Sequence, residues 1–348
     1  MKNIAAVDKN FKVETEIEKS DIRFYDVDNE PFCVYGLIRD NGKYRRIPES
    51  VAKTVNDGVY MLHANTAGGR VRFTTNSRYV AIHAKMENIG KMPHFAFSGS
   101  AGFDLYVKNT YTKTFMPPID IKDGYESVIE FDSRREREIT INFPLYSDVI
   151  KLYIGLEETA EIKPASPYRN AKPIVYYGSS ITQGGCASRP GMSYQSILSR
   201  KFNYDYINLG FSGSARAEDE IVNYIKNLEM SAFVLDYDHN APSPQHLLES
   251  HEKMFLAIRK EHPDIPIIMM TRPKYRLTKD EKARREVVLK TYQYALARGD
   301  ENVYFIDGKA LTALCKDEGT VDNTHPTDYG FVSMAKGIEK VMKNLHLD

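Results

Sequence analysis

An aspartate and a histidine stand three positions apart near the end of the chain. Asp322 and His325 occur in the run Val-Asp-Asn-Thr-His-Pro-Thr over residues 321–327. Three residues on a tight turn place a carboxylate beside an imidazole, which fixes the tautomer that a general base needs to activate a nucleophile. Each of the nine histidines, taken alone, is more often a surface or packed residue than a base. The pair therefore indicates catalysis only if a nucleophile is found elsewhere in the chain.

Three apolar runs further up the chain end in small or amide side chains. In open α/β sheets, ligands gather at the carboxyl ends of the strands, so these ends are where reactive groups are expected. A serine in such a glycine-rich segment can also be a simple turn or helix cap, and an asparagine before a proline can merely start a turn. The candidates are Ser180 in 177–185 (YGSSITQGG), Gly213 in 208–214 (NLGFSGS) and Asn240 in 234–242 (VLDYDHNAP).

Together the four segments resemble, in the same order, the blocks of the SGNH (GDSL-type) hydrolase family. Ser180 stands at the position of the family's nucleophile, and Asp322 and His325 match its Asp-x-x-His pair. Gly213 and Asn240 match the positions whose backbone N–H and side-chain amide stabilise an oxyanion. The resemblance implies a catalytic triad of Ser180, His325 and Asp322. It also implies an oxyanion hole built from the N–H groups of Ser180 and Gly213 and the Asn240 amide.

The chain departs from the family pattern at two places. Ser179 replaces the aspartate that usually precedes the nucleophile. Asn240 lacks the glycine two residues before it and the aspartate after it, and its loop carries three other polar side chains, Asp236, Asp238 and His239. The agreement of four blocks in order outweighs these departures.

The first half of the chain carries a second resemblance. Residues 101–106 read AGFDLY, which is similar to the Gly-x-Asp-Leu-Tyr signature of a β-sandwich domain that accompanies one branch of SGNH hydrolases. Asp104 and Tyr106 in this segment are candidates for substrate binding, although an ordinary strand explains the alternating apolar residues equally well.

The segment after the nucleophile turn offers one more substrate-binding candidate. Arg189 lies close enough in sequence to border the pocket, where it could contact a substrate oxygen or carboxylate, or else pair with an acid of the protein. Cys186 lies nearby. We interpret it as a small packing residue and not as a rival nucleophile, because no histidine is near it in sequence.

Strands with one buried face are expected to dominate residues 30–158. Apolar residues alternate with period two in 71–73, 80–86, 139–143 and 150–156, and Asn-Gly, Gly-Gly and Asp-Gly turns separate such runs. Little in this region has a helical period. We predict an antiparallel, jelly-roll-like β-sandwich as an accessory domain over residues 1–165.

Short apolar runs alternate with long amphipathic stretches after residue 165. This order predicts right-handed crossovers and a parallel sheet between two helical layers, that is, a three-layer α/β/α hydrolase domain over residues 166–348. The proline-containing segment 160–170 is too short for a long tether, so the domains are expected to pack together. The predicted strands are 174–177, 206–209, 232–235, 265–270 and 303–306, and the predicted helices are 192–202, 216–228, 244–261, 278–298 and 327–345.

Composition narrows the classes of partner. In 348 residues, 47 basic side chains balance 47 acidic ones, so no basic field attracts nucleic acid or an anionic membrane. Three scattered cysteines predict unpaired thiols. The first 20 residues contain no signal-peptide pattern, and no window approaches the apolar length of a membrane span. A cytoplasmic protein is the default expectation, whereas removal of a leader would make it secreted or periplasmic.

Several catalytic motifs are missing from the sequence. GxSxG, which marks the larger α/β-hydrolase family, does not occur, and neither do HExxH, P-loop or GxGxxG patterns. We therefore expect no metal and no organic cofactor in the reaction.

The family resemblance implies an ester hydrolase that works through an acyl-enzyme. The accessory β-sandwich resembles the arrangement of carbohydrate esterases, which favours an acetylated sugar or another small ester as substrate. Three alternatives remain at this point. They are a lipase or thioesterase with a longer acyl pocket, an acyltransferase that passes the acyl group to an alcohol, and a carbohydrate-binding protein with an inert hydrolase domain.

Overall fold

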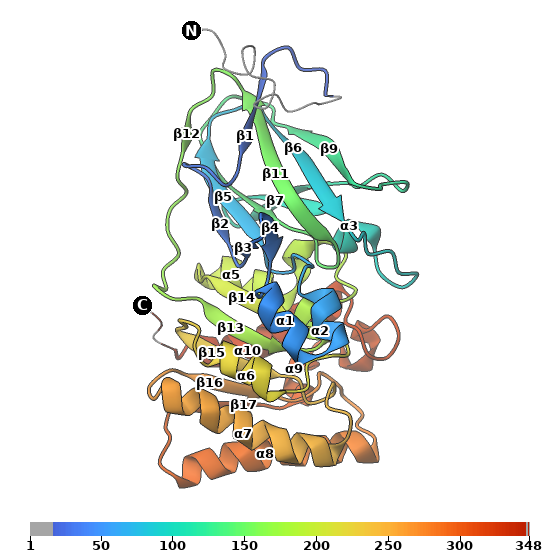
Figure 1. Cartoon of the computed structure of the whole chain (residues 1–348), viewed down its shortest axis with the longest axis vertical. Helices are drawn as coiled ribbons and strands as arrows, with labels where there is room; N and C mark the ends of the chain where they lie inside the picture. Colours follow the sequence, from blue (N-terminus) through green and yellow to red (C-terminus); the bar gives the residue numbers. More distant parts are fainter. Residues whose placement is uncertain (1–16, 346, 348) are drawn as a thin grey trace.

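The computed structural model describes residues 17–345 and residue 347. The first 16 residues, which contain most of the segment examined for a signal peptide, lie outside the described residues. Antiparallel sheets form the first half of the chain, and a parallel sheet flanked by helices forms the second half (Figure 1). The predicted fold class is confirmed. No helix within the described ranges is long and apolar enough to cross a membrane.

Two antiparallel sheets face each other in the N-terminal half. Their strand orders are β1-β11-β6-β9 and β12-β5-β10-β7-β8, with β2 also paired to β5, and β3 and β4 form a separate ribbon. The strands are β1 (Ile22–Asp26), β2 (Cys33–Tyr35), β3 (Ile38–Asp40), β4 (Lys43–Arg45), β5 (Arg70–Thr75), β6 (Tyr79–Glu87), β7 (Phe103–Val107), β8 (Thr110–Phe115), β9 (Gly124–Glu130), β10 (Arg137–Asn142), β11 (Asp148–Glu157) and β12 (Ile162–Lys163).

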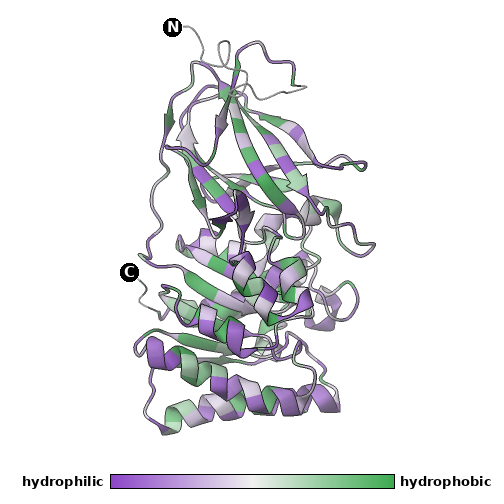
Figure 2. Ribbon diagram, in the orientation of Figure 1, coloured by the Kyte–Doolittle hydropathy of each residue, from purple (hydrophilic) through white to green (hydrophobic). Residues whose placement is uncertain are grey.

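The period-two pattern of these strands is what builds the sandwich core. Phe73 of β5, Ile82 of β6, Ile141 of β10 and Ile154 of β11 are fully buried in one apolar cluster. Because successive side chains of a strand point to opposite faces, alternate positions supply the cluster, and the colouring of Figure 2 alternates along these strands.

The expectation that this half has little helix is wrong over one stretch. Helices α1 (Glu49–Val55) and α2 (Asp57–Leu62) interrupt the strands, and a short helix, α3 (Phe97–Ser100), precedes β7. Ala52 and Val59 are fully buried, but in the apolar core of the α/β half and not in that of the sandwich. Residues of the first half therefore complete the core of the second.

The second half contains five parallel strands in the order β14-β13-β15-β16-β17. Every predicted strand and helix of this half is present, and α7 has the predicted bounds. The strands are β13 (Ile174–Gly178), β14 (Tyr206–Gly210), β15 (Ala232–Asp236), β16 (Ile267–Met270) and β17 (Val303–Ile306). The helices are α4 (Ser180–Gln183), α5 (Tyr194–Phe202), α6 (Asp219–Ile225), α7 (Pro244–Glu261), α8 (Lys279–Ala297), α9 (Gly308–Leu311) and α10 (Asp328–Met342).

Both faces of the parallel sheet are buried. Tyr177 and Leu235 pack in the cluster that contains side chains of α6, α7 and α8. Tyr176 and Val234, their neighbours in sequence, pack in the cluster that contains side chains of α5, α9 and α10. Burial on two sides explains why these strands read as short continuous apolar runs and do not alternate.

The connection between the halves runs from Lys163 to Ile174, and the predicted boundary at 165/166 lies within it. Side chains of this segment form hydrogen bonds to both halves. The hydroxyl of Tyr168 accepts a hydrogen bond from Nε of Arg70 on β5 (2.8 Å), and the side-chain amide of Asn170 donates to the carbonyl of Asp205 (3.0 Å).

Arg46 joins the two halves from the end of the β3–β4 ribbon. It is only 2% exposed, and its guanidinium donates to the carbonyls of Asn65 (2.9 Å), Leu62 (2.5 Å) and Gly210. Gly210 is the last residue of β14, and the guanidinium also lies 4.6 Å from the ring centroid of Phe211. One buried cation thus satisfies carbonyl groups of both halves.

Replacing Arg46 should loosen this contact. We predict that Arg46→Met lowers the free energy of unfolding by about 3 kcal/mol or more, because several buried carbonyls lose a charged donor. Scanning calorimetry tests this prediction, with Arg276→Met, at an exposed arginine, as the matched control. An Arg46→Met protein as stable as the control variant would show that the buried contact contributes nothing to stability.

Candidate active site

The nucleophile candidate stands on a sharp turn from β13 into α4. Gly178 ends the strand, and a Cβ at this position would lie 2.1 Å from Oγ1 of Thr182 and 2.2 Å from the carbonyl oxygen of Asp236. Only glycine fits this approach of strand to helix. Ser180, the first residue of α4, is 6% exposed, and its N–H has no acceptor within the helix because of its position in the first turn.

Ser179 explains why the departure from the family pattern is tolerated. It is the N-cap of α4, where its hydroxyl accepts a hydrogen bond from the N–H of Ile181 (3.1 Å). Thr182 completes a reciprocal capping box by accepting from the N–H of Ser179 (3.1 Å). A serine caps a helix about as well as an aspartate, so the turn keeps its geometry.

Asp322 and His325 lie on a tight loop before α10. The loop is closed by a bridge between Thr320 and Pro326 and by a hydrogen bond from the N–H of Val321 to the carbonyl of His325 (2.9 Å). Oδ1 of Asp322 accepts from the backbone N–H of His325 (2.8 Å). The three-residue spacing therefore holds the carboxylate and the ring on the same side of the loop.

Ser180, His325 and Asp322 form one hydrogen-bonded relay. Nε2 of His325 lies 2.9 Å from Oγ of Ser180, and Nδ1 lies 2.7 Å from Oδ2 of Asp322. Burial alone would raise the pKa of Asp322, but hydrogen bonds from the backbone and ring of His325 outweigh it and lower that pKa to about 2. The carboxylate therefore stays ionised, holds the proton on Nδ1 and leaves the lone pair of Nε2 facing the hydroxyl.

Two basic side chains after β16 hold the loop of Asp322 and His325. Arg272 donates to Oγ1 of Thr324 (2.8 Å), and Nζ of Lys274 donates to the carbonyl of Asn323 (3.0 Å). Arg272 also forms a 3.0 Å ion pair with Glu281 of α8. These contacts fix a loop that is otherwise exposed on its outer side.

Gly213 and Asn240, the two predicted oxyanion residues, lie on neighbouring loops that both bond to the carbonyl of Phe211. Phe211 accepts a hydrogen bond from the N–H of Ser214 (2.9 Å) and another from the side-chain amide of Asn240 (2.9 Å). That contact uses one of the two amide hydrogens of Asn240 and leaves the other for a ligand. Gly213 has a φ of +67° with open space where a Cβ would be, so the turn conformation and not crowding favours glycine.

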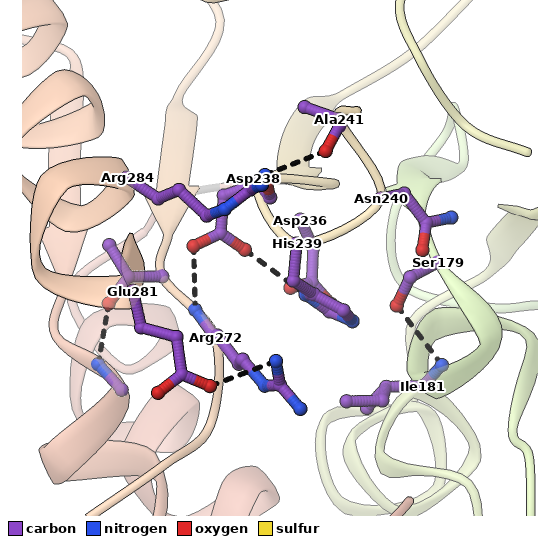
Figure 3. A network of polar contacts seen from close by, with 12 residues as sticks. Ser179, Ile181, Asp236, Asp238, His239, Asn240, Ala241, Arg272, Glu281 and Arg284 are labelled. Atoms are coloured by element: carbon purple, nitrogen blue, oxygen red, sulfur yellow. Dashed lines mark hydrogen bonds and ion pairs between the residues drawn. The ribbon is translucent and has the colours of Figure 1, made fainter. Parts of the chain in front are cut away.

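A buried polar network orders the loop of Asn240 (Figure 3). Nδ1 of His239 lies 3.1 Å from Oδ1 of Asp238, and the backbone N–H of Arg272 donates to Oδ2 of Asp238 (3.1 Å). Arg284 of α8 donates to the carbonyls of Asp238 (2.9 Å) and Ala241 (2.7 Å). Since Arg272 also reaches Thr324, the network links the Asn240 loop to the loop of the base.

Asp236 lies beneath the turn that carries Ser180. It is fully buried, and its Oδ2 accepts hydrogen bonds from Oγ1 of Thr182 (2.8 Å) and from the hydroxyl of Tyr194 (3.0 Å). Burial, assisted by the nearby charge of Asp238, raises the pKa of Asp236 to about 7. This carboxyl supports the turn of Ser180 from below.

The sandwich half brings residues to the site that the sequence analysis missed. The hydroxyl of Tyr146 donates to the carbonyl of Ser180 (3.3 Å), and the ring of His94 lies 5.5 Å from that of His325, centroid to centroid. Gln183 of α4 donates to the side chain of Asn65 (3.0 Å). No motif marks these residues, because only the packing of the two halves brings them near the relay.

Cys186 follows the nucleophile turn and is buried. Burial, together with the negative charge of Asp322, raises the pKa of its thiol to about 12. A thiol in this state is a poor nucleophile at neutral pH, which agrees with its interpretation as a packing residue. All three cysteines are unpaired.

Asp104, Tyr106 and Arg189 lie where the two halves meet. Asp104 is fully buried, and its carboxylate accepts from the side-chain amide of Asn142 (2.8 Å) and from the N–H of Gly191 (2.8 Å). Nε of Arg189 lies 3.6 Å from the same carboxylate. A Cβ at Gly191 would lie 2.4 Å from the hydroxyl of Tyr106. The contacts observed for these three residues join the halves, and their binding of substrate stays a prediction.

An α/β/α domain with a serine at the end of its first strand and an acid–imidazole pair before its last helix, joined in one relay, defines a serine hydrolase of the SGNH class. Residues 171–343 match the GDSL-like lipase/acylhydrolase family, and residues 22–162 match the N-terminus of SGNH hydrolase-type esterases, known as GxDLY. The chain belongs to this family, in the branch with an N-terminal β-sandwich, and is an esterase. A comparison with curated proteins gave no match.

Solved structures with both halves resemble the chain over nearly its whole length. A protein named as a GDSL-like lipase from Bacteroides ovatus is 30% identical, with a TM-score of 0.82, and the alignment covers 92% of this chain and 98% of that one. The salicylyl-acyltransferase SsfX3 of a tetracycline biosynthetic pathway is 19% identical (TM-score 0.78; 95% and 100% covered). An acetyl xylan esterase from Butyrivibrio proteoclasticus is 11% identical (TM-score 0.61; 92% and 98% covered). The last two show the fold alone.

The raised pKa of Asp236 should make the free energy of unfolding depend on pH. In the folded chain the Asp236 carboxyl keeps its proton up to about pH 7, whereas an aspartate in the unfolded chain loses its proton near pH 4. The free energy of unfolding of the wild type therefore decreases as the pH rises from about 4 to about 7. Asp236→Asn keeps the neutral form at every pH. Its stability relative to wild type should therefore increase between pH 4 and 7, by up to about 1.4 kcal/mol per pH unit.

Urea unfolding of both proteins at pH 5 and pH 8 measures this difference. A constant difference between Asp236→Asn and wild type across the two pH values would contradict the raised pKa.

Proposed function

We propose that the protein hydrolyses short acyl esters of carbohydrates, acetyl esters above all, through an acyl-enzyme on Ser180. The observation that carries the proposal is the relay, with 2.9 Å between Nε2 of His325 and Oγ of Ser180 and 2.7 Å between Nδ1 and Asp322. These distances are those of a nucleophile and a base oriented by an acid.

Each step of the proposed reaction uses this relay. Nε2 of His325 takes the proton of the Ser180 hydroxyl while Oγ bonds to the ester carbonyl carbon. The imidazolium, stabilised by Asp322, then gives the proton to the leaving alcohol oxygen as the ester C–O bond breaks. Water attacks the acyl-enzyme, His325 takes its proton, and Ser180 leaves with that proton as the acid is released.

The negatively charged oxygen of each tetrahedral intermediate must be stabilised by hydrogen-bond donors. We assign these to the N–H groups of Ser180 and Gly213 and to the amide hydrogen of Asn240 that does not bond to Phe211. The buried network beneath Asn240 keeps the amide preorganised, so little reorganisation accompanies the reaction. Removal of one such donor typically costs about 3 kcal/mol of transition-state stabilisation.

The surroundings of the relay favour a short acyl group on a hydroxyl-rich alcohol. Three polar groups lie beside the relay and α4: the hydroxyl of Tyr146, the ring of His94 and the N–H of Ser212, which donates to Gln183 (3.2 Å). A long acyl chain needs an apolar wall. The shared fold of the acetyl xylan esterase supports the same substrate class by analogy.

The first test is a panel of acetylated sugars and nitrophenyl esters of increasing chain length. Acetyl esters should be hydrolysed fastest, and Ser180→Ala should lose about 10⁴-fold or more in kcat with an unchanged unfolding temperature. Ser133→Ala, at an exposed serine of the sandwich, is the matched control. Normal turnover by Ser180→Ala would exclude Ser180 as nucleophile, and a preference for long chains would replace the acetylesterase with a lipase.

The second test concerns the acid. Asp322→Asn keeps the size of the side chain but no longer fixes the tautomer of His325, so kcat should fall by about 10³- to 10⁴-fold. Steady-state kinetics on the best acetyl ester measures this loss. A decrease of less than tenfold would mean that His325 does not need the acid.

Acyl transfer to an alcohol is a second candidate, by analogy with the salicylyl-acyltransferase that shares the fold of both halves. Both reactions share the acyl-enzyme and differ in the group that attacks it. Product analysis with a sugar acceptor in the assay separates them. Free acid as the main product supports hydrolysis, and an acylated acceptor as the main product supports transfer.

A further inference from the structure

Three side chains that bind transition metals converge beside the relay. One ring nitrogen of His94, one ring nitrogen of His325 and Sγ of Cys186 all lie within 4.8 Å of one another. They come from three parts of the chain: the sandwich loop before α3, the turn after α4 and the loop before α10. The site therefore exists only when the two halves are packed together.

The donor set is that of a zinc-type site. Two imidazole nitrogens and one thiolate suit Zn²⁺ and related ions, with bonds of about 2.0–2.1 Å to nitrogen and 2.3 Å to sulfur. Tetrahedral geometry with these bonds places the ligand atoms about 3.5 Å apart. Since all three atoms lie within 4.8 Å of one another, no pair has to close by more than about 1.3 Å to reach this spacing, and the exposed side chain of His94 is free to rotate toward the other two.

The hydrogen bond between Asp322 and His325, which belongs to the relay, also suits a metal ligand. A histidine that ligates a metal almost always donates its other ring N–H to a carboxylate or carbonyl, which fixes the tautomer and the ring orientation. Oδ2 of Asp322, 2.7 Å from Nδ1 of His325, already occupies that position. Nε2 is left as the ligating atom, and it is also the atom that faces Ser180.

We propose that His94, Cys186 and His325 bind a divalent ion of the Zn²⁺ class and that the bound ion inhibits the enzyme reversibly. The ion occupies the lone pair of Nε2, so His325 can no longer accept the proton of Ser180. The thiol of Cys186 releases its proton to solvent as the thiolate binds, and water completes four ligands. Inhibition rests on the proposed function, whereas metal binding does not.

Inhibition is tested by titrating ZnCl₂ against nitrophenyl acetate hydrolysis, with each protein normalised to its own metal-free rate. Wild type should be inhibited and should recover with EDTA. In His94→Ala and Cys186→Ser the inhibiting concentration should rise by at least about tenfold, because even an outer partner of a metal ligand contributes about 10- to 100-fold to affinity. Cys33→Ser and His262→Ala, outside the cluster, are the matched controls and should behave as wild type.

Binding is tested separately with Co²⁺ on Ser180→Ala, a protein that keeps all three ligands whether or not it hydrolyses esters. A near-ultraviolet thiolate-to-cobalt absorption band should appear, and it should be missing from the double variant Ser180→Ala/Cys186→Ser. Absence of the band from Ser180→Ala would overturn the proposal. Equal sensitivity to Zn²⁺ in wild type, His94→Ala and Cys186→Ser would also overturn it.

Discussion

The hydrogen bond between Nε2 of His325 and Oγ of Ser180 joins two loops that are 145 residues apart in the chain. The proposed chemistry depends on this contact, because a hydroxyl without a base within about 3 Å is a weak nucleophile at neutral pH. Each side of this contact is fixed by local structure. A capped turn with no room for a side chain at Gly178 presents Ser180, and a closed loop places Asp322 under the ring of His325. Arg272 connects the loop of Asn240 to the loop of His325, because it binds Asp238 in the first and Thr324 in the second.

The sandwich half acts on this site through packing. Arg46 binds the end of β14, Asp104 binds Gly191 in the segment after the nucleophile turn, and Tyr146 binds the carbonyl of Ser180 itself. Helices α1 and α2 belong to the first half in sequence and to the α/β core by burial. These contacts make the relay sensitive to the first half of the chain, although the relay residues all come from the second. They also give a physical reason for the two halves to occur together in relatives with the same architecture.

Local sequence patterns were sufficient to predict the strands and long helices of the second half and the residues of the relay. Short apolar runs and amphipathic stretches located every strand and long helix of the second half, and the four blocks located the relay, because both signals are contained in neighbouring residues. Helices α1 and α2 were missed because their seven and six residues lie between strands. Their buried residues, Ala52 and Val59, face a core that is distant in sequence. The positions of Tyr146 and His94 could not be predicted for the same reason, since each approaches the relay only through tertiary packing. Gly213 was predicted from its place in the family pattern, and its left-handed backbone is the reason for glycine that the structure adds.

The central claim is that the hydroxyl of Ser180 is activated by His325, and active-site labelling tests it most directly. Wild type, His325→Ala and Ser180→Ala are treated with a fluorophosphonate, which reacts with activated serines, and the adduct is mapped by peptide mass spectrometry. We predict one adduct, on Ser180, in wild type and none in either variant. Labelling of another serine, or equal labelling of Ser180 in His325→Ala, would contradict the account.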